Sequence, residues 1–182
     1  MNVIVIFTYG ISLKNWDESG ILDREMSFYE RMSEKYNINY SFITFGFEDD
    51  ESYVQRFKGF NIYPVYKYIK FSNNKYLNLF RSFLIPFKLK KQLSGNQLIK
   101  TNQLNGAWVA IVLKKLLKIP LFTRTGYNLY EFSLYNKKSR LIKLFHYLLT
   151  QAALLFSDLY TVTSKTDRDF LEEKFKISKN IE

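Results

Sequence analysis

The sequence predicts an α/β fold: a Rossmann-like parallel sheet with helices on both faces. Residues 3–7 (Val-Ile-Val-Ile-Phe) form an uninterrupted apolar run, typical of a strand buried on both faces. Apolar residues at helical spacing over 109–117 lie between two short apolar runs, 98–99 and 119–123, and so predict a strand–helix–strand unit. The same alternation of strand-like and helical patterns continues along the chain, as expected for a parallel sheet.

Strands are expected where short apolar runs stand between turn or helix signals. In chain order, the predicted strands cover residues 3–7, 40–45, 61–65, 98–99, 119–123 and 159–163. Pro120 prevents the preceding helix from continuing into the fifth of these strands. Lys114, Lys115 and Lys118 complement the dipole at the end of that helix, which begins after Gly106.

The other helices are predicted from capping signals and apolar stripes. A loop over 9–18 is expected to lead to a first helix, opened by Ser19 and Gly20, with Leu22, Met26, Tyr29 and Met32 on its buried side. A polar and aromatic loop over 128–139 precedes a long helix. Its buried stripe is predicted to consist of Leu141, Leu144, Phe145, Leu148, Leu149, Ala152, Leu155 and Phe156. Ser164 and Asp167 form a capping pattern for a last helix that ends near Phe175.

Composition limits the possible chemistry. With 182 residues, 47% of them hydrophobic, the chain can bury the core of a single domain, taken as residues 1–182. The absence of cysteine excludes disulfides and thiolate chemistry, and the single histidine, His146, makes a metal site improbable. His146 falls within a helix, which favours a packing or surface role. Without a signal peptide or an apolar run near the roughly 20 residues that span a bilayer, we expect a cytoplasmic protein.

Positive charge is concentrated in the middle of the chain. The net charge is +10, and no Asp or Glu occurs between Glu51 and Glu131. The cations of this stretch are Arg56, Lys58, Lys67, Lys70, Lys75, Arg81, Lys88, Lys90, Lys91, Lys100, Lys114, Lys115, Lys118 and Arg124. Such a surface attracts nucleic acid, anionic lipid or phosphorylated ligands through the same long-range force, so charge alone does not choose among them.

Residues 66–92 mix cations with aromatic and aliphatic side chains. Rings at the headgroup level and cations facing anionic lipid are the requirements of an interfacial membrane surface. A core helix with a solvated basic edge is an equally good interpretation of the pattern. The basic residues follow no nucleic-acid-binding element, so we expect no nucleic-acid partner.

Polar side chains are expected along one rim of the sheet, because ligands of parallel sheets bind beyond the carboxyl ends of the strands. The predicted rim residues are Asn102, Gln103, Asn105, Arg124, Thr125, Gly126 and Tyr127. Gly20, which follows the loop over 9–18 at the predicted helix start, offers a second candidate anion site, because unpaired N–H groups and the helix dipole favour a phosphate there. The pattern lacks the G-x-G-x-x-G fingerprint, which argues against a Rossmann dehydrogenase.

Taken together, four segments resemble the N-terminal, acceptor-side domain of a GT-B glycosyltransferase of the family-4 type. They are Ser19-Gly20, residues 100–107 (Lys-Thr-Asn-Gln-Leu-Asn-Gly-Ala), residues 120–127 (Pro-Leu-Phe-Thr-Arg-Thr-Gly-Tyr) and residues 157–165 (Ser-Asp-Leu-Tyr-Thr-Val-Thr-Ser-Lys). The likeness covers nearly the whole chain. Two departures stand out: the second, donor-binding domain has no counterpart in this sequence, and the histidine that many members carry before the glycine of the fifth loop is replaced by Thr125.

The resemblance implies a sugar transferase of cell-surface polysaccharide synthesis. Its donor would be a nucleotide-sugar and its acceptor a lipid-linked saccharide at the inner face of the membrane, with a C-terminal glycosyltransferase domain supplied in cis or trans. No metal cofactor is implied. Arg124 and Thr125 are the implied catalytic residues; Ser19, Gly20 and Gly126 would approach the donor diphosphate, and Gln103, Asn105, Tyr127 and Glu131 the sugar substrates.

The predicted rim residues are compatible with either a retaining or an inverting sugar transfer. A retaining reaction needs no carboxylate base from this half, which agrees with the lack of acidic residues on the fourth and fifth loops. An inverting reaction needs one, and Asp17, Glu18 and Glu131 are the carboxylates in plausible positions. The alternative function is a non-catalytic basic α/β module that binds an anionic membrane surface or nucleic acid.

Overall fold

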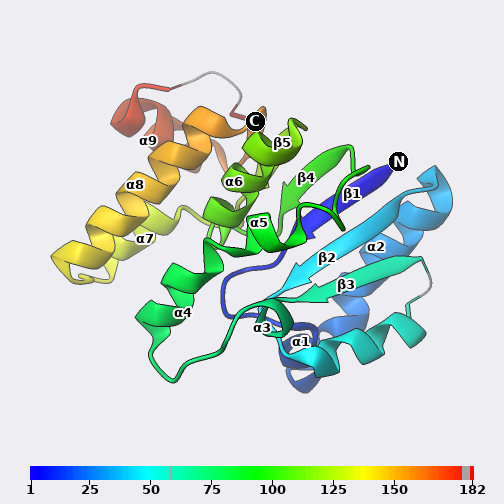
Figure 1. Ribbon diagram of the computed structural model, residues 1–182. Coiled ribbons are helices and arrows are strands. Elements are labelled where there is room, and N and C mark those ends of the chain that lie inside the picture. The colour runs from blue at the N-terminus through cyan, green and yellow to red at the C-terminus, as the bar shows by residue number, and fades with distance from the viewer. Residues whose placement is uncertain (58, 178–180) are drawn as a thin grey trace.

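The computed structural model of the protein describes residues 1–57, 59–177 and 181–182. Within them, six strands form one fully parallel sheet in the order β3-β2-β1-β4-β5-β6 (Figure 1). The strands are β1 Asn2–Ile6, β2 Asn39–Thr44, β3 Phe60–Pro64, β4 Leu98–Thr101, β5 Leu121–Arg124 and β6 Leu159–Thr161. The predicted fold class and all six strands are thereby confirmed, with boundaries that differ by a few residues.

The chain reverses its direction of travel across the sheet at β1. On one side Val5 pairs with Phe42 of β2, and on the other with Lys100 of β4. Because every strand runs the same way, the segments that follow β1, β4 and β5 emerge at one edge. This reversal point is where open α/β sheets bind their ligands.

Helices cover both faces of the sheet (Figure 1). The longer ones are α2 Leu22–Tyr36, α4 Lys75–Ser82, η1 Glu48–Gln55 (a 3-10 helix), α6 Ala107–Leu117, α8 Arg140–Phe156 and α9 Lys165–Phe175. The shorter ones are α1 Leu13–Glu18, α3 Val65–Tyr68, α5 Ile85–Leu89 and α7 Leu129–Tyr135. The predicted cap of the last helix is confirmed, since the Ser164 hydroxyl accepts the Asp167 N–H at 3.1 Å.

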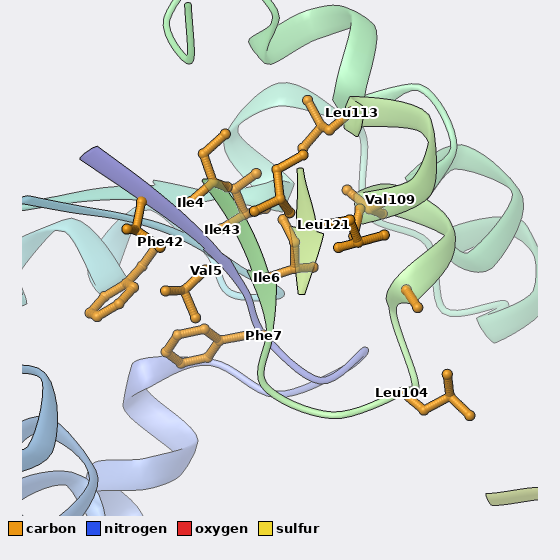
Figure 2. Close-up of a cluster of buried hydrophobic side chains, with 14 of the residues drawn as sticks. Ile4, Val5, Ile6, Phe7, Phe42, Ile43, Leu104, Val109, Leu113 and Leu121 are labelled. Atoms are coloured by element: carbon orange, nitrogen blue, oxygen red, sulfur yellow. The ribbon is translucent and has the colours of Figure 1, made fainter. Parts of the chain in front are cut away.

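The sheet is buried between two apolar layers because alternate residues of each strand point to opposite faces. Val5 and Phe42 lie on the face that α2 covers, where the rings of Tyr29 and Phe42 are 5.1 Å apart. Figure 2 shows Ile4, Ile6 and Leu121 on the opposite side, directed at Val109 and Leu113 of α6. All of these aliphatic side chains are almost fully buried.

The prediction of a loop over 9–18 was wrong, because α1 occupies its second half. Ser12 and Asn15 form a capping box: the Ser12 hydroxyl accepts the Asn15 N–H, and the Asn15 side chain accepts the Ser12 N–H at 2.9 Å. Buried Asp50 accepts the N–H groups of Leu13 and Lys14 at 3.2 and 3.1 Å. A distant carboxylate thus completes the helix start, a contact that local spacing does not reveal.

The prediction that Ser19 and Gly20 open the first long helix was also wrong. Ser19 is instead the C-cap of α1, and its hydroxyl donates to the Asn15 carbonyl at 2.6 Å. Gly20, at φ +69°, forms the tight turn after it, and α2 begins at Leu22. The first turn of α2 carries Asp23 and Glu25, whose carboxylates are stabilised by the positive end of the helix dipole.

Two further differences lie near the end of the chain. The predicted loop over 128–139 contains α7, which starts where the Asn128 side chain accepts the Glu131 N–H at 3.3 Å. The predicted buried stripe of α8 was wrong for Leu141, Leu144, Leu148, Leu155 and Phe156, which are 80%, 54%, 52%, 60% and 38% exposed. Leu149 is buried as predicted, and Ala153 and Leu154 face the core beside it in place of the exposed leucines.

Glu182 pairs beside β6, where its N–H donates to the Tyr160 carbonyl at 2.9 Å. Lys58, one of the cations counted above, and residues 178–180 of the terminal segment lie outside the described residues. In the described part of the chain, none of the helices is both long and apolar enough to cross a bilayer.

Candidate functional site

A pocket of about 310 Å³ opens at the reversal point of the sheet. We call it the switch-point pocket. Its lining comes from five places: Thr8 after β1, α1 with its cap residue Ser19, Glu25 of α2, the loop after β4 with Asn102 and Gln103, and Arg124 at the end of β5. Three of the predicted site residues, Ser19, Gln103 and Arg124, therefore meet in one cavity, as expected from a parallel sheet whose strands end at the same edge.

Arg124 brings an exposed cation to this pocket. Its backbone is fixed, because its N–H donates to the Thr101 hydroxyl at 3.1 Å. None of the carboxylates in the described ranges lies within 4.0 Å of its guanidinium. An unpaired guanidinium at the mouth of a pocket can bind a phosphate or carboxylate through two parallel hydrogen bonds.

Gln103 and Gly126 join the loops that follow β4 and β5. The Gly126 N–H donates to the Gln103 side-chain oxygen at 2.7 Å. A Cβ atom at position 126 would lie 2.8 Å from the Gln103 side-chain nitrogen, closer than real contacts allow. Alanine at 126 would therefore push the Gln103 amide aside, and the two loops form one unit next to Arg124.

Thr125 and Gly20 do not face the switch-point pocket. Thr125 is 2% exposed, and its hydroxyl donates to the Thr161 carbonyl at 2.8 Å, so it ties β5 to β6. Gly20 lines neither the switch-point pocket nor the two larger cavities described below. Ser19 does line the pocket, although its hydroxyl already donates to α1 carbonyls.

The remaining predicted residues stand around the rim. The Asn105 carbonyl accepts the Tyr9 N–H at 2.9 Å and so holds the loop after β1 against the start of α6. Tyr127 is half exposed, and its ring packs 5.3 Å from that of Phe132. Glu131 is in the first turn of α7. The structure does not bring these three side chains into the switch-point pocket.

A second cavity of about 520 Å³, the outer pocket, adjoins the first beyond β1, β2 and β3. Asn15 lines both pockets, which makes them neighbours. The outer pocket combines aromatic walls from Tyr9 and Tyr66 with several hydroxyl, amide and charged groups, a mixture suited to a polar organic ligand. The Tyr9 hydroxyl donates to the Lys75 carbonyl at 3.1 Å, and burial raises the pKa of Tyr9 to about 12, so it stays protonated as a donor.

A third cavity of about 530 Å³, the lysine pocket, lies between α2 and the sheet. Arg124 and Glu25 line both it and the switch-point pocket. Its inner wall carries Lys100 of β4, whose pKa is lowered to about 8, mainly because burial disfavours the charged form and also because Arg124 repels it. Sequence reasoning did not select Lys100 as a site residue; the available signal was a charged residue inside the short apolar strand 98–101.

Exposed apolar side chains gather on α4, α5 and α8. Tyr76, Phe80 and Phe87 are 70%, 73% and 61% exposed, and the outer leucines of α8 are exposed as well. Trp108 of α6 connects these helices, because its ring lies 5.9 Å from Phe83 and 6.0 Å from Phe145. Figure 1 shows α4 and α8 on the same side of the sheet. Segments 75–91 and 137–156 contain Lys and Arg but no Asp or Glu. We call this surface the basic apolar face.

His146 lies on α8, away from the three pockets, and burial lowers its pKa. Across residues 1–57, 59–177 and 181–182, no group of three or more His, Cys, Asp or Glu residues is arranged to hold a metal ion.

Comparison with known proteins identifies the fold. No protein-family model and no curated protein matches the sequence. Among solved structures, Anabaena HepE in complex with UDP-glucose matches with a TM-score of 0.60 and 11% identity, over 100% of this chain and 43% of that one. The apo form of the lipopolysaccharide outer core galactosyltransferase WaaB matches with a TM-score of 0.59 and 12% identity, over 100% of this chain and 44% of that one. The chain thus spans less than half the length of these structures, and its fold is that of the N-terminal half of a GT-B protein.

Proposed function

Because the chain has the fold of a GT-B N-terminal half, we propose that it is the acceptor-side half of a glycosyltransferase. In this proposal it transfers a sugar from a nucleotide-sugar to a lipid-linked saccharide during cell-surface polysaccharide synthesis. A C-terminal domain, in cis or in trans, binds most of the donor. The observation that carries the proposal is the unpaired Arg124 guanidinium at the reversal point of the sheet. The whole of this chain matches part of HepE, a protein seen with UDP-glucose.

Arg124 is the proposed electrostatic catalyst. Breaking the bond between sugar and nucleotide builds negative charge on the leaving diphosphate, and a preorganised cation stabilises that charge in the transition state. The Gly126 loop, held by Gln103, fixes the backbone beside Arg124. This role is that of a divalent metal in other enzymes, so we propose a metal-independent reaction.

We further propose a retaining reaction, because two of the three candidate bases, Asp17 and Glu131, are engaged elsewhere or distant. Asp17 accepts the Tyr53 hydroxyl at 2.8 Å and lies 3.6 Å from Arg56, so its carboxylate is already paired. Glu131 lines none of the three pockets in the described part of the chain. Glu18 lines the outer pocket and remains the base that an inverting reaction would use.

The outer pocket is the proposed acceptor site. Its position next to the switch-point pocket, through Asn15, allows an acceptor hydroxyl to meet a donor sugar held at Arg124. Its aromatic and amide groups suit the apolar faces and hydroxyl groups of a saccharide.

The basic apolar face is the proposed membrane contact, which makes the protein peripheral at the inner face of the cell membrane. Rings and leucines of α4, α5 and α8 enter the headgroup region, while the neighbouring cations meet anionic lipid. The same face supports a second candidate function, a non-catalytic module that only binds membranes.

The experiment that tests the catalytic proposal is sugar transfer by the chain together with its C-terminal domain. A panel of nucleotide-sugars is offered with a lipid extract that contains saccharide acceptors, and labelled lipid product is measured. Arg124→Gln should lower turnover about 100-fold or more, as expected when one transition-state donor is lost. Arg31→Gln on the exposed side of α2 is the matched control and should retain wild-type activity. Turnover of no donor at all supports the membrane module, whereas wild-type activity of Arg124→Gln removes Arg124 from the site.

The membrane contact is tested by flotation with vesicles that contain anionic lipid. Replacing Lys88, Lys90 and Lys91 by Glu should release the protein from the vesicles, because surface cations each contribute about 1 kcal/mol to such binding. Binding driven partly by ring burial should survive moderate salt, while binding to nucleic acid through phosphates alone should not. Unchanged flotation of the triple variant contradicts the proposed contact.

A further inference from the structure

The lysine pocket lies on the face of the sheet opposite α6. Lys100 and Phe122 are cross-strand partners, as are Arg124 and Thr161, and all four side chains project toward this face. They remain only partly covered, because α2 packs over β1 and β2, where Tyr29 contacts Tyr40 and Phe42. The result is a hollow that a ligand can enter from solvent.

Lys100 contacts only neutral groups in this hollow, although Glu25 in the pocket wall attracts it electrostatically. Its ammonium group donates to the Tyr29 hydroxyl at 3.1 Å and lies 4.9 Å from the centre of the Tyr29 ring and 5.8 Å from that of Phe28. Within the part of the chain that the structure describes, its nitrogen has no carboxylate inside 4.0 Å. A partly buried ammonium without a counter-ion is costly, since contacts with ring faces replace only part of its hydration.

The pocket as a whole carries surplus positive charge. Glu25 is the one carboxylate among its lining residues, and it is paired with Arg24 at 2.8 Å. Lys100 and Arg124 are therefore left facing the same cavity, and each raises the energy of the other. The lowered pKa of Lys100 has the same origin, burial first and Arg124 second. An anion between the two cations would offset both the burial cost of the Lys100 ammonium and its repulsion by Arg124.

We propose that the lysine pocket binds a phosphorylated small molecule, with its phosphate between Lys100 and Arg124. The volume of about 530 Å³ exceeds what a bare phosphate needs and falls in the range of small-ligand pockets. Phe28 and Phe122 form an apolar wall beside the cations, which suits a flat or apolar group attached to the phosphate. The proposal does not rest on sugar transfer, and it assigns Lys100 a role that the rim chemistry does not use.

The first test uses sulfate as the probe, because it mimics phosphate and carries no titrating proton near pH 8.5. Binding is measured by calorimetry on the full chain at constant ionic strength, with sodium chloride as the background salt. Lys100→Met should weaken sulfate binding about tenfold or more, the loss expected for one charge-assisted hydrogen bond. Lys118→Met, an exposed lysine at the far end of α6, is the matched control and should bind as the wild type does.

The second measurement is proton uptake. Because an anion favours the charged form of Lys100, sulfate binding near pH 8.5 should draw a fraction of a proton from the buffer. The measured heat should then depend on the ionisation enthalpy of the buffer in the wild type and in Lys118→Met but not in Lys100→Met. A purely structural lysine, packed on Tyr29 and Phe28, predicts no such dependence.

The third measurement compares phenyl phosphate with methyl phosphate. The apolar wall predicts tighter binding of phenyl phosphate, and Phe122→Ser should remove the difference. Sulfate binding that is unchanged in Lys100→Met, or that does not exceed the chloride background, overturns the proposal. Should Lys100→Met not fold, Lys100→Gln and Arg124→Gln replace it, and wild-type affinity in both overturns the proposal equally.

Discussion

Lys100 should make the stability of the protein depend on pH in a way that one substitution removes. Its pKa is lowered from 10.5 to about 8 in the folded state. Below pH 8 the ammonium is charged in both states, and its burial costs the folded state at most about 3 kcal/mol, at 1.36 kcal/mol for each unit of pKa. The folded state releases its proton at lower pH than the unfolded state. The cost is therefore relieved as pH rises from about 8 and is absent above about 10.5.

Lys100→Met replaces the ammonium by an apolar chain of similar length. At pH 7 the variant should gain up to about 3 kcal/mol, because the lowered pKa already includes the attraction of the ammonium to the rings. By pH 9.5 the penalty in the wild type has fallen to about 1.5 kcal/mol. The stability difference between variant and wild type should therefore shrink by about 2 kcal/mol over this interval.

The assay is urea unfolding of both proteins at pH 7.0, 8.0, 8.75 and 9.5. Tyrosines that titrate at high pH are common to both proteins, so their contributions cancel in the difference. Lys118→Met is the control and should show a constant difference from the wild type across the series. A pH-independent difference for Lys100→Met would refute the reasoning, because it would mean that Lys100 ionises as it does in the unfolded chain.

Three other predictions concern the frame of the site and are measured by urea unfolding. Gly106→Ala should lower the free energy of unfolding by about 1–3 kcal/mol more than Gly10→Ala. Both positions have positive φ, but only at 106 would a Cβ lie 2.9 Å from a backbone oxygen. Equal losses of stability in the two variants would contradict this. Asp50→Asn should cost about 1–3 kcal/mol because it weakens the carboxylate cap of α1, whereas Asp49→Asn, which breaks an exposed ion pair, should cost under about 1 kcal/mol. Ser82→Ala should cost about 1–3 kcal/mol because it leaves the buried indole N–H of α6 without its acceptor at 2.8 Å, and wild-type stability would argue against that hydrogen bond.

The sheet and its rim could be predicted because they follow from patterns of single residues. Uninterrupted apolar runs identified the strands, and the alternation of strands and helices implied that Gln103 and Arg124 end at the same edge. Their meeting in one pocket needed no knowledge of individual contacts.

What the sequence did not reveal depends on contacts between distant segments. The start of α1 is completed by Asp50 of η1, in the connection between β2 and β3, so the short pattern of α1 alone reads as a loop. The face that α8 buries is chosen by its neighbours, since the helix has leucines on more than one side and either stripe fits the spacing. Lys100 looked like an ordinary strand residue until β5 and α2 brought Arg124 and Tyr29 beside it.

The hydrogen bond between Gln103 and Gly126 has a consequence for the history of the two positions. Because the amide occupies the space that a methyl group at 126 would need, alanine at 126 would displace the Gln103 amide and weaken this hydrogen bond. A smaller side chain at 103 makes room for alanine at 126 but loses the hydrogen bond to the Gly126 N–H. Substitutions at the two positions should therefore be correlated. Related chains should therefore display either this pair or a joint replacement.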